Sequence, residues 1–162
     1  MAWNVTNLLG ATIGTVDSSP NWPLGMKATA RNTTSGYMGE FMYMKGAATT
    51  AAGTWALLNY DDGTTTLLVD GAIGPVGIAT AATIASTYGW YQVQGKASGK
   101  LIAGTAEDLG LYAQITSSAG MAGVTSAGMS EIKGAASAQA TTSAAAIVEV
   151  EINYPVVGLK TG

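Results

Sequence analysis

The stretch that decides the fold is AIVEVEINY, at residues 146–154. Val148, Val150 and Ile152 alternate with polar residues, so an extended backbone places the apolar side chains on one face and the charged ones on the other. This alternation predicts a β-strand with those three residues in the core. The strand is expected to end at Pro155, because proline has no backbone N–H to donate to a sheet.

A hairpin is predicted upstream of this strand. Residues 54–60 (TWALLNY) and 64–70 (TTTLLVD) both have the composition of strands. Between them, Asp62-Gly63 favours a tight turn, since glycine accepts a positive φ. Trp55 lies inside the first of these strands and is a predicted core residue.

Two further strands are predicted at residues 40–46 and 88–100, the second with a bulge or bend at Gly95. Trp90 lies in the second strand and is also a predicted core residue. One short helix is expected at residues 78–87, where IATAATIAST is rich in alanine. The 22 glycines indicate many turns. The predicted class is therefore all-β with one short helix.

The amino-acid composition limits the kinds of catalysis and binding that the chain can support. The chain has 162 residues, 48% of them hydrophobic, which suits one domain with one core. Histidine and cysteine are both absent, which removes nucleophile–histidine pairs and soft-metal sites. The seven basic residues are scattered singly and the net charge is −3, so no cluster is available to bind nucleic acid. We predict a protein that is not an enzyme, with no catalytic residue, cofactor or metal, and no nucleic-acid partner.

The carboxylates allow two alternatives, each weighed against a simpler interpretation. Asp61, Asp62 and Asp70 could bind a hard cation such as calcium, but turn-forming aspartates explain them better. Glu149 and Glu151 share a strand face and could form an acid pair. A solvated face, or a contact between subunits that involves a lysine, is the favoured interpretation.

Residues 1–25 differ from the rest, because Asn, Gly, Ser and Pro interrupt every period while large apolar side chains recur. Such a segment is ordered only if its side chains find a surface to cover. We predict an extended N-terminal arm (1–25) that binds a partner, followed by a single β-rich domain (26–162). Trp22 could instead fold back onto the domain. The predicted partner-contact residues of the arm are Trp3, Val5, Leu8, Leu9, Ile13, Trp22 and Leu24.

The N-terminus lacks the basic and apolar regions of a signal peptide, and no window approaches the ~20 apolar residues of a membrane helix. Synthesis in the cytoplasm and no membrane partner are expected.

Three segments, in order, resemble head decoration (capsid cement) proteins of tailed bacteriophages: residues 40–68, residues 74–104 and residues 146–157. The most characteristic pieces are Tyr88-Gly89-Trp90 before a strand and the EINYP sequence near the end. The chain departs from the resemblance at residues 117–134, where Ala, Gly and Ser replace a more acidic pattern.

The resemblance implies a compact β-barrel or β-tulip fold on the outer surface of the virion capsid. The implied partner is the major capsid protein, whose neighbouring subunits the protein would bridge, and self-association is expected as a trimer in preference to a dimer. The alternatives are a virion surface module for host or glycan attachment, and a tail-tube or head-completion protein.

Overall fold

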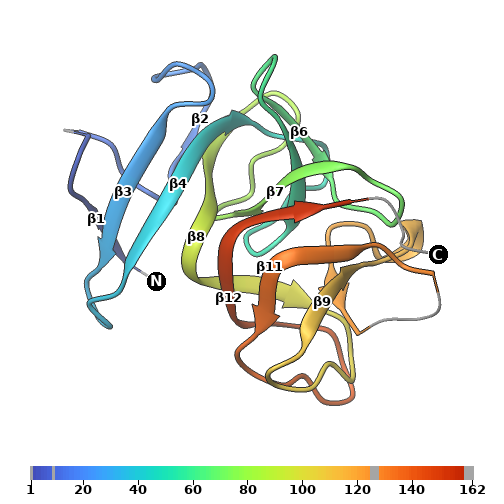
Figure 1. The fold of residues 1–162 in the computed structure, drawn as a ribbon. Helices are drawn as coiled ribbons and strands as arrows, with labels where there is room; N and C mark the ends of the chain where they lie inside the picture. The colour runs from blue at the N-terminus through green and yellow to red at the C-terminus, as the bar shows by residue number, and fades with distance from the viewer. Residues whose placement is uncertain (1, 9, 125–127, 159–162) are drawn as a thin grey trace.

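A computed structural model describes residues 2–8, 10–124 and 128–158. Strands dominate the described part, and its one helical segment is a single 3-10 turn, so the prediction of an all-β chain is confirmed (Figure 1). The elements are β1 Trp3–Val5, β2 Val16–Asp17, β3 Lys27–Asn32, β4 Met38–Lys45, β5 Trp55–Asn59, β6 Thr64–Leu67, β7 Gly74–Ala79, β8 Tyr88–Leu101, β9 Gly110–Ala113, η1 Thr116–Ser118, β10 Ala122–Gly123, β11 Glu131–Ser137 and β12 Ala146–Val157.

The long strand β8 organises the sheet because its two halves have different partners. Its first half pairs with β4, up to Glu40 opposite Gln94. Its second half pairs with β12, from Asn153 opposite Gln94 onward. The change of partner occurs beside Gly95, whose φ is +99°. The bend predicted at this glycine is therefore present, and Figure 1 shows β8 curving between the two groups of strands.

Strand pairings starting from β8 pass through β12, β11, β9 and β10 and return to β8. The largest core cluster includes side chains from several of these strands and from β5, among them Trp55, Leu101, Leu111, Ile132 and Val150. These five residues are at most 1% exposed. Period-two alternation places Val76 and Ile78, Leu111 and Ala113, and Val150 and Ile152 in the cluster, whereas β11 reaches it with residues three apart across its bulge.

Strand β12 continues past Pro155, contrary to the predicted end. Tyr154 has a positive φ of 46°, which shifts the strand at this point. Pairing with β8 stops at Asn153, and pairing with β7 begins at Val156. Pro155 thus lies where the strand changes partner, and the ladder does not require its missing N–H.

The helix predicted at residues 78–87 does not form. Ile78 pairs with both Trp55 and Gln92, so the segment begins as the end of β7. The rest of the segment is irregular and is tied to β8 by side chains, among them the hydroxyl of Thr83, which lies 2.5 Å from that of Tyr91. A ten-residue alanine-rich helix is marginal in water, and these tertiary contacts outweigh its propensity.

The structure does not confirm an extended N-terminal arm. Strand β1 pairs antiparallel with β3, and β2 pairs with β8. Trp3 packs edge-on against Phe41, with ring centroids 4.9 Å apart, and Ile13 is buried. The segment is apolar without being periodic because it covers β3, β4 and β8 of its own chain.

Tyr43, on β4, forms hydrogen bonds with the second half of this segment. Its hydroxyl donates to the Asp17 carboxylate at 2.5 Å and accepts from the Asn21 N–H at 3.3 Å. Burial, followed by the hydrogen bond to Asp17, raises the pKa of Tyr43 from 10.0 to about 12. The neutral hydroxyl is therefore the form that the folded chain favours.

Replacing this hydroxyl is expected to loosen the N-terminal segment. Tyr43→Phe should lower the free energy of unfolding by about 1–3 kcal/mol, because Asp17 and the Asn21 N–H lose their partner. The raised pKa of Tyr43 adds stability below pH 10, which is lost as the pH rises from 10 to 12. Urea unfolding between pH 8 and 12 measures both effects. Equal loss of stability by the wild type and Tyr43→Phe over that interval would contradict this assignment.

Candidate functional site

The acidic residues considered at the sequence level are dispersed or engaged in local structure. Among the described residues, no group of three or more His, Cys, Asp or Glu side chains is placed to hold a metal ion. The Asp62 carboxylate accepts hydrogen bonds from the N–H (2.9 Å) and hydroxyl (2.6 Å) of Thr64, which lower its pKa. Asp70 accepts from the Ser130 N–H at 2.8 Å on another part of the chain. Asp62 therefore stabilises its own turn, whereas Asp70 joins two distant segments of the chain.

Glu149 and Glu151 form ion pairs within the chain. The Lys96 ammonium lies 2.8 Å from the Glu149 carboxylate and 3.8 Å from that of Glu151. The hydrogen bond that Lys96 donates to the Glu149 carboxylate raises the pKa of Lys96. The sequence left open a solvated face or a contact with a lysine of another subunit. Both carboxylates are partly exposed, and the lysine beside them belongs to β8 of the same chain, opposite β12.

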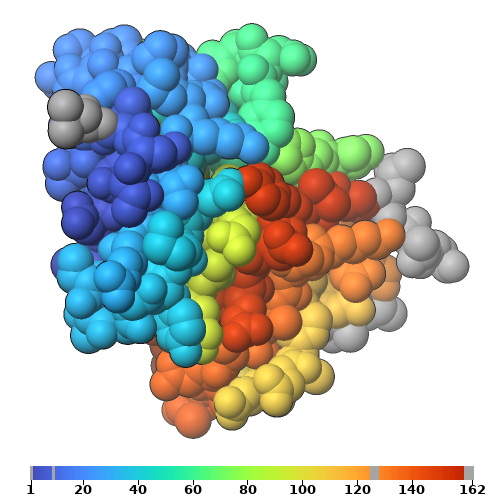
Figure 2. All heavy atoms as spheres, turned by 60° about the vertical axis from the view of Figure 1, so that its left-hand side comes forward, coloured from blue at the N-terminus to red at the C-terminus, as the bar shows by residue number. Residues whose placement is uncertain are grey.

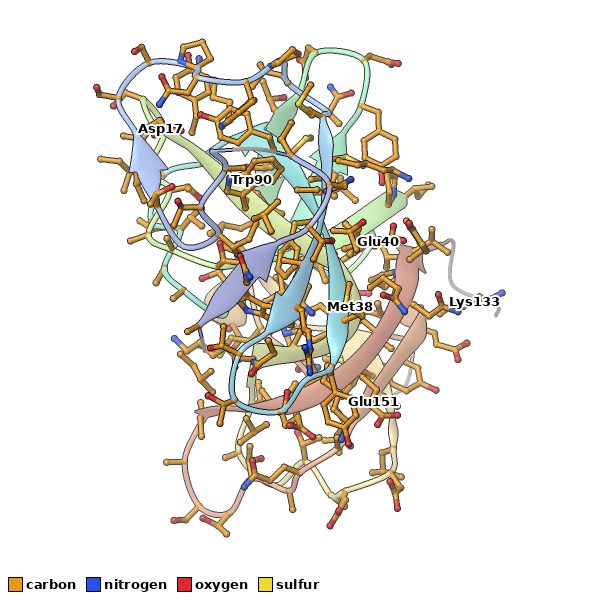
Figure 3. All side chains as sticks on the ribbon, turned by 90° about the vertical axis from the view of Figure 1, so that its left-hand side faces the viewer. Asp17, Met38, Glu40, Trp90, Lys133 and Glu151 are labelled. Carbon is orange, nitrogen blue, oxygen red and sulfur yellow. The ribbon has the colours of Figure 1, made fainter. Side chains whose placement is uncertain are left out.

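The predicted core residues lie in the interior. Trp55 and Trp90 are 0% and 1% exposed, Val150 and Ile152 are buried, and Val148 packs at the margin of the core. Figure 3 shows Trp90 under the N-terminal segment, near Asp17.

The predicted contact residues of the arm differ in how deeply they are buried. Trp3, Val5, Leu8 and Trp22 are half-buried against the cluster that contains Phe41, Tyr43 and Trp90, and Ile13 is buried in it. Leu24 is exposed. Leu9 lies outside the described residues.

The structure brings together an exposed apolar surface that the sequence did not indicate. It contains Leu24, Lys27, Tyr60, Ile73 and Tyr154, and we call it the Tyr60 surface. Tyr60 and Ile73 are 51% and 60% exposed and border one hollow of about 440 Å³. Leu24 packs over Gly63, which lies in the same turn as Tyr60.

Lys27 links the two sides of the Tyr60 surface. Its ammonium lies 4.8 Å from the ring centroid of Tyr154, and its charge partly offsets the burial that raises the pKa of Tyr60. The Tyr154 hydroxyl in turn donates to the Glu40 carboxylate. Figure 2 shows the β5–β6 turn (green), the start of β7 (light green) and the end of β12 (red) along one side of the molecule.

Sequence reasoning missed the Tyr60 surface because its members are far apart in the chain, and neither the EINYP motif that contains Tyr154 nor the prediction of Leu24 as a contact residue indicated that they meet. The one available signal was an unusual number of large apolar residues in turns, at positions 24, 60 and 73.

In the described part of the chain, no helix is both long enough and apolar enough to span a membrane. No family model, curated protein or solved structure matches this chain.

Proposed function

We propose that this chain is a structural protein of a tailed-phage head that binds the outer surface of the capsid and bridges neighbouring major capsid subunits. The resemblance of residues 40–157 to decoration proteins and the β-rich fold support the proposal. The ring of pairings through β8, β12, β11, β9 and β10 is also compatible with the barrel or tulip form of such proteins.

The observation that carries the proposal is the Tyr60 surface. Large apolar side chains exposed side by side indicate an interaction surface rather than ordinary solvent exposure. Tyrosine and isoleucine side chains bury a large area and have few rotatable bonds. Lys27 is the one positively charged residue of the Tyr60 surface. With only 10% of the chain charged, the surrounding surface is also inexpensive to desolvate.

The proposed capsid contact differs from the one that the sequence suggested. Ile13 is buried within the chain, so it has little surface left for a partner. Leu24 remains exposed and belongs to the Tyr60 surface. The outward edges of Trp3, Val5, Leu8 and Trp22 can add to the contact without leaving their own domain.

The mechanism is adhesive and requires no catalysis. A capsid under internal DNA pressure fails where neighbouring subunits separate. A protein bound across that boundary stabilises the assembled shell, because it binds that state alone. If copies associate, as a trimer in preference to a dimer, each further contact forms at high effective concentration and avidity rises by ~10²–10⁴.

Particle composition tests the proposal. Intact virions of the phage that encodes the chain are expected to carry hundreds of copies, which antibodies detect on the outside of the head. A small multiple of copies at one site would identify a tail-tube or head-completion protein instead, and absence from the particle would refute the proposal.

Paired variants test the contact surface. Double replacement of Tyr60 and Ile73 by serine is expected to weaken binding to capsids assembled without the protein by about thirtyfold or more, since central apolar anchors dominate binding energy. Ile84→Ser is the matched control, because Ile84 is 50% exposed on the loop between β7 and β8. Sedimentation with capsids measures both. Equal binding by the double variant and the control would place the contact elsewhere.

A further inference from the structure

A groove of about 580 Å³ lies between β4 and β12, over the point where β8 changes partner. Figure 2 shows β4 in cyan and β12 in red on either side of β8, and Figure 3 shows Met38 and Glu151 on the two walls. Gly95 forms part of the floor, and a Cβ there would meet the Met38 carbonyl oxygen at 2.5 Å. The strand arrangement therefore builds the groove, whose volume is in the range of ligand sites.

Tyr37 stands at the edge of this groove with its side chain in solvent. It is 54% exposed and precedes β4 in the chain. Tyr37 and Lys96 also border a second hollow of about 270 Å³, which Trp3 and Ser35 help to line. Two adjoining hollows that share one aromatic ring suit an extended ligand with repeated units.

The charged groups around the two hollows are paired with one another. The Lys96 ammonium lies 5.0 Å from the Tyr37 ring centroid and is paired with Glu149 and Glu151. Ammonium N–H groups donate hydrogen bonds and carboxylates accept them, and the Asn153 amide on the groove wall can do both. The paired lysine and glutamates lose less side-chain entropy when a ligand binds than unpaired side chains would.

The backbone around the groove offers little for a peptide strand to pair with. Glu151 and Ile152 pair with β8 on one side and β11 on the other. The carbonyl groups of Gln94 and Lys96 accept hydrogen bonds from the Gln92 side chain. Recognition must therefore rely on side chains rather than on an added strand.

The charge around the groove limits the classes of ligand that it can bind. One ammonium and two carboxylates give the two hollows together a net negative charge, which disfavours nucleic acids and other anionic polymers. An aromatic ring beside alternating donors and acceptors instead suits a ligand with apolar C–H faces and a rim of hydroxyl groups.

We infer that the groove between β4 and β12 binds a neutral oligosaccharide, with Tyr37 packing against a sugar ring and Lys96, Glu149, Glu151 and Asn153 bonding its hydroxyl groups. The two hollows on either side of Tyr37 accept successive sugar units. This function adds to the proposed capsid contact and uses a different part of the surface.

The test uses the purified full chain and calorimetric titration with maltoheptaose, cellohexaose, chitohexaose and mannohexaose, with heparin hexasaccharide as the anionic comparison. At least one neutral oligosaccharide is expected to bind. Tyr37→Ala should lower its affinity tenfold or more, whereas Tyr37→Trp retains binding. Tyr60→Ala is the matched control, because it removes an equally exposed tyrosine outside both hollows and should leave affinity within twofold.

Three outcomes would overturn the inference: no neutral oligosaccharide binds, the heparin fragment binds more tightly than all of them, or Tyr37→Ala binds as well as the wild type. A peptide selected from a random library whose binding needs Tyr37 would assign the groove to a protein partner instead. Unchanged thermal unfolding of Tyr37→Ala and Tyr60→Ala ensures that the comparison concerns binding.

Discussion

A chain that starts at Met26 is expected to lose most of its stability and to aggregate. The removed segment covers Phe41, Tyr43 and Trp90, which are at most 1% exposed in the intact chain. Uncovering a large apolar side chain costs up to about 1.5–3 kcal/mol, and three such losses approach the ~5–15 kcal/mol total stability of a domain. Solubility after expression and the thermal unfolding midpoint measure the effect.

Single substitutions test whether the loss of stability comes from uncovering these core side chains or from shortening the chain. Trp3→Ala removes the ring that packs on Phe41 and should cost about 1–3 kcal/mol, less than a fully buried tryptophan because Trp3 is half-buried. Val16→Ala, at a side chain 42% exposed, should change stability by less than about 0.5 kcal/mol. A soluble truncated chain with an unchanged unfolding midpoint would contradict this role and restore the hypothesis of an arm completed by another protein.

The strands were predictable where the pattern is local. Alternation at residues 146–154 and the composition of residues 54–68 each fix an extended segment, and side-chain burial then follows from period two. Gly63 has the positive φ, +70°, that the Asp-Gly pair favoured. Its turn is longer than a two-residue hairpin, because the last pair is Asn59 opposite Thr64.

The N-terminal segment was not predictable by the same reasoning. Its partners are β3, β4 and β8, and the hydrogen bond from Tyr43 to Asp17 joins residues 26 positions apart. A segment without periodicity gives no sign of whether it will cover its own domain or a neighbouring protein. Only the number of large apolar residues, which requires some cover, could be read from the sequence.

The two candidate surfaces were likewise predictable only in part from the sequence. Gly95 marked a bend, but the groove above it depends on β4 and β12 separating at that point, which is a property of the sheet order. The Tyr60 surface joins residues from positions 24 to 154, so topology alone assembles it. Residue types at these positions were visible, whereas their proximity was not.

Gly46→Ala is expected to be among the most destabilising single substitutions in the chain. A Cβ at this position would lie 2.0 Å from the carbonyl oxygen of Thr83 and 2.6 Å from that of Ile84. Both atoms belong to the backbone of the loop before β8, so no side-chain rotation relieves the overlap. We expect a loss of about 3 kcal/mol or more, which lowers the unfolding midpoint by about 6–12 °C.

The loop cannot simply move away from Gly46, because it is held on both sides. The Gly46 N–H donates to the carbonyl of Thr87 at 2.8 Å, and the buried hydroxyl of Thr83 lies 2.5 Å from that of Tyr91. Any shift that makes room for a methyl group therefore strains or breaks these buried hydrogen bonds, each of which is costly to leave unmade. Gly110→Ala is the matched control, since a Cβ there meets nothing within 4 Å and its backbone needs no positive φ. Equal unfolding midpoints for the two variants would show that the β7–β8 loop yields without cost, and the close approach at Gly46 would then not constrain this part of the fold.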